Sequence, residues 1–101
     1  MILARVVFQA KFGKANDVVT AFKTMYDGVV AEMLESLQPR ILTDLSGPFD
    51  TVVLETTHES LAAYEEFRKA LFAETDASQE SSPIADLVVS GRNEYYTIES
   101  L

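Results

Sequence analysis

The sequence predicts one α+β domain in which an antiparallel four-stranded sheet carries two long helices on one face. Two observations lead to this fold class. Alternating or β-branched apolar runs mark four short segments, as expected for strands, and apolar residues spaced three or four apart mark two longer segments, as expected for amphipathic helices. At 101 residues the chain has room for one modest core, so we expect a single domain over residues 1–101.

The first strand is predicted over residues 2–12, because every even position in this segment is apolar. Gly13 ends the alternation, and a helical spacing of apolar residues continues over residues 14–38 until Pro39. We therefore expect one amphipathic helix about 35 Å long. Gly28 lies in the middle of it, where glycine costs roughly 1 kcal/mol relative to alanine, and we expect it to permit the close approach of another backbone.

The next segment predicts a hairpin followed by a second helix. Strands are expected at residues 40–45 and 49–57, joined through Ser46-Gly47-Pro48, because Gly-Pro between two apolar runs is a turn signal. The second helix, "ESLAAYEEFRKALFA", begins at Glu59 or Ser60 and has one apolar face.

The C-terminal part predicts a short helix and a last strand. Ser82-Pro83 has the form of an N-cap followed by proline at the first helical position, so a helix is expected over residues 83–89, ending at Gly91. "NEYYTIES", residues 93–100, is rich in β-formers and is interpreted as the final strand.

The resulting order, strand, helix, strand, strand, helix, strand, is the ferredoxin-like βαββαβ plan with two right-handed crossovers. Both long helices then lie on the same face of the sheet. Apolar side chains are nevertheless expected on the other face, namely Leu3, Val7 and Leu42 with some of Phe49, Val53 and Tyr95. Such a face is unfavourable in water, so we expect a homodimer packed sheet to sheet.

The segment "GPFDTVV", residues 47–53, with the helix start at residues 60–63 and the turn at residues 68–71, resembles the dimeric α/β-barrel superfamily. Within it the chain is similar to NIPSNAP-type and antibiotic-biosynthesis-monooxygenase-like proteins, with Asp50 where the hairpin "G-P-x-N-x-V-V" usually has asparagine. The resemblance implies a ferredoxin-like monomer that dimerises through its sheets, sometimes with a small-molecule cavity between helices and sheet.

The resemblance does not imply one activity. Some relatives are cofactor-independent oxygenases, some degrade haem, some isomerise lactones, and many have no assigned reaction. Haem-degrading relatives use a tryptophan and an axial histidine, whereas this chain has no tryptophan and only His58, so we expect no haem and no other cofactor.

Composition excludes further classes of partner. Sixteen acidic against eight basic residues give a net charge of −8, which disfavours nucleic acid and anionic membrane surfaces. Without cysteine, disulfides and thiolate sites are excluded. No apolar run reaches the roughly 20 residues of a membrane span and no signal-peptide pattern is present, so we expect a cytoplasmic protein. Its glutamate pairs are expected on solvated helix faces, so no metal site is predicted.

His58 is the weak catalytic candidate, because imidazole titrates near neutral pH. The competing interpretation is a polar residue at the junction of strand and helix that satisfies free N–H groups of the first turn. Strand alternation places His58 with Thr56 on one face and Glu55 on the other, which disfavours a His58–Glu55 dyad.

A ligand site is predicted where tyrosines converge beneath the helices. Tyr26, Tyr64 and Tyr95 or Tyr96 would line it, with Arg5 or Arg40 as a charged anchor. Tyrosine suits a pocket for an aromatic or polyketide-like molecule, although tyrosine at helical spacing also occurs as ordinary core.

Three functions stay open at this point. The first is a homodimer of unassigned function that binds a small organic molecule between helices and sheet. The second is a cofactor-independent monooxygenase or isomerase with His58 or a tyrosine as proton-transfer group. The third is a structural or interaction dimer, which a cleft filled by Phe22, Phe67 and Leu71 would favour.

Overall fold

The computed structural model describes residues 1–75 and 84–101, and it confirms the predicted ferredoxin-like α+β class. One antiparallel sheet has the strand order β2-β3-β1-β4. The strands are β1 (Ile2–Ala10), β2 (Arg40–Thr43), β3 (Thr51–His58) and β4 (Val88–Thr97). The helices are α1 (Ala15–Met25), α2 (Gly28–Leu34) and α3 (Leu61–Thr75), with a 3-10 turn, η1 (Glu35–Leu37). No helix in the described part of the chain is long and apolar enough to cross a membrane.

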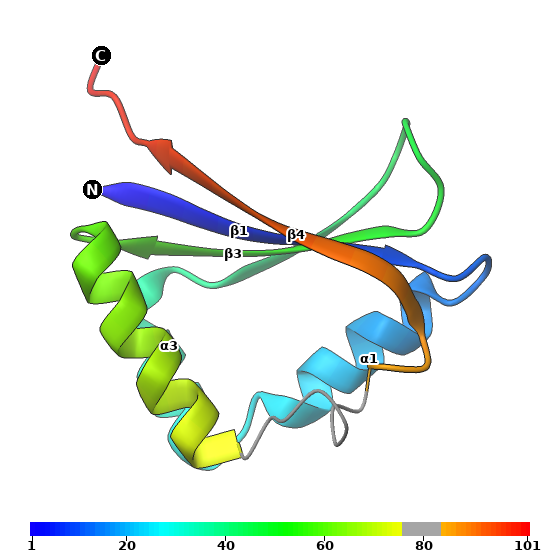
Figure 1. Cartoon of the computed structure of the whole chain (residues 1–101), viewed down its shortest axis with the longest axis horizontal. Helices are drawn as coiled ribbons and strands as arrows, with labels where there is room; N and C mark the ends of the chain where they lie inside the picture. Colours follow the sequence, from blue (N-terminus) through cyan, green and yellow to red (C-terminus); the bar gives the residue numbers. More distant parts are fainter. Residues whose placement is uncertain (76–83) are drawn as a thin grey trace.

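The helices cover one face of the sheet, and Figure 1 shows the opposite face without a second layer. Even-numbered residues of β1 point to the helices: Ala10 packs in the core with Val18 of α1 and Val52 of β3. Phe8 meets Phe22 of α1 with 5.4 Å between ring centroids. Because side chains alternate along a strand, the odd-numbered residues of β1 lie on the helix-free face.

The single long helix predicted over residues 14–38 is wrong, because the chain breaks after α1. Asp27 is extended, with φ −153° and ψ 154°, and Gly28 has a φ of +51°. The expected reason for the glycine is also wrong, since nothing lies within 4 Å of where its Cβ would stand. Glycine is needed there for the left-handed backbone that redirects the chain into α2, which packs against α3.

The short helix predicted over residues 83–89 is wrong where the structure describes it, and Ser82-Pro83 lies outside the described residues. Residues 84–87 form a turn, in which the Leu87 N–H donates to the Ile84 carbonyl at 2.9 Å. The last strand therefore begins at Val88, five residues before the predicted start, and it ends at Thr97.

Gly91 does not end a helix but lies in β4 directly opposite Phe8. A Cβ on Gly91 would stand only 3.3 Å from the Phe8 ring. The glycine thus makes room for an aromatic side chain of the neighbouring strand, which sequence spacing does not distinguish from a helix stop.

Asp50, the unusual residue of the "GPFDTVV" hairpin, joins the loop between β2 and β3 to the start of α1. Its carboxylate accepts hydrogen bonds from the N–H groups of Gly13, at 2.9 Å, and Ala15, at 3.3 Å. Its φ of +61° is left-handed, a conformation in which asparagine and aspartate are enriched among non-glycine residues. The backbone therefore suits either residue, but only aspartate has two acceptor oxygens for the two N–H groups.

The start of α3 agrees with the predicted boundary. The Ser60 hydroxyl accepts a hydrogen bond from the Ala63 N–H at 3.1 Å, which satisfies one of the free donors of the first helical turn.

Candidate functional site

The predicted site residues are divided between the two faces of the sheet. Tyr64 of α3 and Tyr95 of β4 come together on the helix-covered face, with ring centroids 5.4 Å apart. Tyr26 follows the last residue of α1 and is 47% exposed, and no ring contact joins it to Tyr64 among the residues described. Arg5 and Arg40 lie on the helix-free face, so they cannot anchor a ligand beside these tyrosines.

His58, the last residue of β3, is buried under α3 at 3% exposure. Its Nε2 shares a hydrogen bond with the Thr56 hydroxyl at 2.7 Å. Its ring meets the Tyr64 ring edge-on, with 5.1 Å between the ring centroids. It meets the Phe67 ring at a tilt, with 5.3 Å between the centroids. We call His58, Tyr64, Phe67 and Tyr95 the aromatic cluster.

Burial shifts two pKa values in the aromatic cluster. It lowers the pKa of His58 and keeps the imidazole neutral, because the charged form loses hydration. Burial, followed by the neighbouring Tyr95, raises the pKa of Tyr64 above its usual value. Both groups are therefore held in their neutral forms, with their rings in edge-to-face contact.

The helix-free face carries a feature that the sequence interpretation did not include. Arg40, Glu55, Arg5 and Glu94 lie directly opposite one another on β2, β3, β1 and β4, and we call them the charge row. Arg40 Nη2 lies 2.5 Å from Glu55 Oε1, and Arg5 Nε lies 3.0 Å from Glu55 Oε2. Arg5 Nη1 reaches Glu94 Oε1 at 3.2 Å. Positive and negative groups thus alternate across the whole sheet.

Glu55 is the most buried member of the charge row, with only 6% of its side chain exposed. A buried carboxylate needs ionic partners, and the two guanidinium groups provide them. The Arg5 Nε–H is close to Glu55 but not aimed at it, and it has no hydrogen-bond partner within the described residues.

Glu94 ends the charge row at the edge strand. Arg92 Nε donates to its Oε2 at 2.8 Å and the Tyr96 hydroxyl to its Oε1 at 3.2 Å. The hydrogen bond from Arg92 is the main cause that holds the pKa of Glu94 below its usual value.

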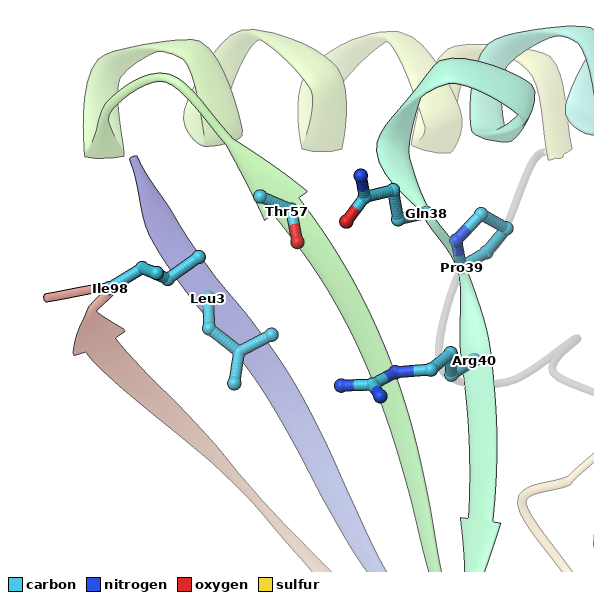
Figure 2. A pocket seen from close by; sticks show the side chains of 6 residues that line it. All are labelled: Leu3, Gln38, Pro39, Arg40, Thr57 and Ile98. Atoms are coloured by element: carbon cyan, nitrogen blue, oxygen red, sulfur yellow. The ribbon is translucent and has the colours of Figure 1, made fainter. Parts of the chain in front are cut away.

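A groove of about 450 Å³ lies next to the charge row, at the end of the sheet where β2 begins (Figure 2). Its lining residues are Leu3, Gln38, Pro39, Arg40, Thr57 and Ile98. Figure 2 shows the Gln38 side chain extending toward Thr57 and the Arg40 guanidinium reaching across β3. Gln38 itself has a left-handed backbone, with φ +52°, after the turn η1.

A second hollow, of about 340 Å³, lies at the opposite end of the sheet beside the hairpin. It is lined by Phe12, Gly13, Asp44, Phe49 and Asp50. Neither hollow is lined by Tyr26 or Tyr64. Within residues 1–75 and 84–101, no three histidine or carboxylate side chains are grouped to hold a metal ion.

The signal for the charge row was present in the sequence. Arg5 and Glu55 each interrupt a strongly apolar strand, in "LARVV" and "VVLETT", and a charge in such a position needs a partner when it is buried. Pairing them required the strand register, which no local pattern provides.

No protein-family model matches the chain, and no curated protein matches it either. Solved structures do match. An uncharacterised NIPSNAP domain protein from Burkholderia xenovorans has 14% identity and a TM-score of 0.79, with 99% of this chain and 96% of that chain covered. A NIPSNAP family protein from Agrobacterium tumefaciens has 18% identity and a TM-score of 0.69, with 95% and 90% covered. The chain has the NIPSNAP-type fold.

A dimeric ferredoxin-like protein from an uncultured marine organism is also similar to this chain, at 8% identity and a TM-score of 0.72, with 99% of this chain and 94% of that chain covered. The resemblance expected from the "GPFDTVV" hairpin is therefore confirmed as a shared fold. Identities of this size carry no residue roles, so chemistry must come from the residues of this chain.

Proposed function

We propose that this NIPSNAP-type protein is a homodimer that binds a small organic molecule, and that its helix-free face is both the dimer interface and the floor of the site. One observation carries the proposal: the face that lacks a second layer is the one that holds the charge row and the groove. The sequence had placed the ligand beneath the helices, but there Phe22 and Phe67 pack against Phe8 and His58.

The charge row supports a second copy of the chain as the partner. From β2 to β4 the signs run positive, negative, positive, negative, so the reversed order is complementary. A two-fold axis parallel to the strands would set Arg40 opposite the negative end of the other row and Glu55 opposite its inner positive member. A structural neighbour described as a dimeric ferredoxin-like protein supports dimerisation as such.

The dimer can be tested with two neighbouring residues of β2. Leu42 lies on the helix-free face and Ile41 on the helix-covered face, and each is 37% exposed. We expect Leu42→Asp to convert a dimer of 11.2 kDa chains to monomers in light scattering, and Ile41→Asp to leave the dimer mass unchanged. A monomeric parent protein, or equal effects of both variants, would contradict the proposal.

The oxygenase or isomerase alternative keeps one observation in its favour, the gathering of His58, Tyr64 and Tyr95 into the aromatic cluster. Its test is oxygen uptake with an electron-rich phenol in the parent protein and in His58→Gln. Equal rates in the two proteins would remove His58 from any such chemistry.

The cytoplasmic location stays part of the proposal and is checked by cell fractionation.

A further inference from the structure

We infer that the groove at the start of β2 binds a small organic carboxylate, with Arg40 as its anchor and an apolar body against the opposite wall. This inference names the ligand class of the function proposed above and rests on it only for the second copy that would cover the groove.

Arg40 has donors to spare. A guanidinium carries five N–H donors, and Arg40 contacts Glu55 through one nitrogen, Nη2. The Arg40 side chain is 63% exposed and lines the groove, so the remaining donors are accessible to a ligand. A planar carboxylate matches this fork geometry because its two oxygens can accept two parallel N–H hydrogen bonds at once.

The charge around the groove favours an anion although the chain as a whole carries −8. Glu55 is shared between Arg40 and Arg5, so two positive groups face one carboxylate at this end of the charge row. Glu94, the other carboxylate of the row, lies on β4 and is bound to Arg92 as well. Within one copy of the chain, a ligand carboxylate beside Arg40 would therefore balance a local excess of positive charge, and in the proposed dimer it would share the Arg40 guanidinium with the negative end of the partner's row.

The remaining wall of the groove is suited to an apolar body. Leu3, Pro39 and Ile98 contribute apolar surface, while Thr57 and Gln38 contribute hydrogen-bonding groups. The groove is open to solvent in one chain, so the second copy would have to enclose the rest of the ligand. The mixed lining favours a short aliphatic or aromatic acid over inorganic phosphate.

Gln38 provides an independent argument. A left-handed residue after a helical turn is usually glycine or asparagine, because other side chains are strained there. Glutamine occupies this position at φ +52° and directs its amide into the groove (Figure 2). Strain retained at a groove-lining residue indicates that the side chain itself is used.

The experiment titrates the full-length chain with phenylacetate, phenylacetamide and inorganic phosphate, and follows the backbone amide resonances of Leu3, Thr57 and Ile98. We expect saturable shifts with millimolar phenylacetate and at least about tenfold weaker binding of the neutral amide and of phosphate. Phosphate binding as tight as phenylacetate, equal binding of the amide, or no saturable shift would each overturn the inference.

Arg92 offers a matched control for Arg40. Both bind one carboxylate of the charge row, and their side chains are 67% and 63% exposed. Arg40→Gln should weaken phenylacetate binding at least about tenfold, and Arg92→Gln should leave it unchanged. Gln38→Gly should keep or raise the melting temperature and still weaken binding, which a purely structural role of Gln38 would not produce.

The light-scattering mass of the same samples separates this inference from the dimer proposal. A dimer that does not bind phenylacetate overturns the carboxylate site alone. A monomer that binds it through Arg40 overturns the dimer alone. Loss of binding in Arg40→Gln with an unchanged dimer mass supports both.

Discussion

The two faces of the sheet are made by the same four strands, yet they are stabilised by different physics. On the helix-covered face, apolar and aromatic side chains fill the space beneath α1 and α3, and Val18 and Val52 are completely buried. On the helix-free face, a buried carboxylate is held by two arginines in strict strand register. The helix-covered face therefore tolerates changes of shape poorly, whereas the helix-free face depends on charge balance.

The largest effect on stability is expected from removing Glu55, the buried carboxylate of the helix-free face. Glu55→Ala leaves Arg5 without its buried partner and should lower the free energy of unfolding by about 3 kcal/mol, at the low end for buried pairs because the arginines reach water. Glu94→Ala, at the 21% exposed end of the row, should cost clearly less, because water screens its ion pairs. Urea denaturation measures both. Equal losses would show that burial does not set the strength of the row.

The next effect compares adjacent valines on opposite faces. Val52→Ala in the core should cost about 2–3 kcal/mol at any protein concentration, since it removes fully buried methyl groups. Val53→Ala on the helix-free face should cost about 1 kcal/mol and should also raise the dissociation constant of the dimer. Denaturation and light scattering over a range of concentrations distinguish the two. A concentration-dependent effect of Val52→Ala would reverse the assignment of faces.

A smaller effect is expected at Asp50, which connects the hairpin to the covered face. Asp50→Ala removes the acceptor for two N–H groups and places alanine at a left-handed φ, so it should cost about 1–2 kcal/mol. Asp50→Asn keeps the backbone preference and one of the two acceptor oxygens, so it should cost less than Asp50→Ala, about 0.5–1 kcal/mol. Thermal unfolding compares them, and equal losses in the two variants would show that the remaining acceptor and the left-handed preference contribute nothing.

The smallest effect is a dependence of stability on pH from the covered face. The folded-state pKa of His58 lies below 6.5, so the unfolded chain takes up a proton that the folded chain resists. The contribution of neutral His58 to the free energy of unfolding is fully present above pH 6.5. It is lost as the pH falls from 6.5 toward the lowered pKa of the folded state. Because His58 is the chain's only histidine, His58→Phe should remove the slope between about pH 7.5 and about pH 5.5, above the range of ordinary carboxyls. Urea denaturation at the two values checks it.

Much of the fold followed from sequence periodicity, because the four strands and the second long helix have strong local patterns. The exceptions have identifiable causes. The break after α1 depends on the left-handed backbone of Gly28, which a helical apolar pattern does not reveal, and Gly91 was misread because its reason is the ring of Phe8 on another strand. Local signals cannot report such partners.

The candidate site was less accessible to prediction than the fold. The sequence pattern singles out Arg5 and Arg40 as charged anchors, and Arg40 does line the groove. It does not single out Glu55, which binds both arginines. Tyr64 and Tyr95 meet, whereas Tyr26 does not join them, because the helix ends one residue before it. A one-residue difference in strand register would have moved Arg5, Arg40 or Tyr95 to the opposite face of the sheet.

The carboxylate of Asp50 also links segments that are far apart along the chain, since its hydrogen-bond donors are 37 and 35 positions away. The first turn of α1 is thus completed only when the hairpin between β2 and β3 has docked. Hydrogen exchange at the Gly13 and Ala15 amides therefore reports the opening of that hairpin, and the N-terminal helix and the middle of the chain should open as one cooperative unit.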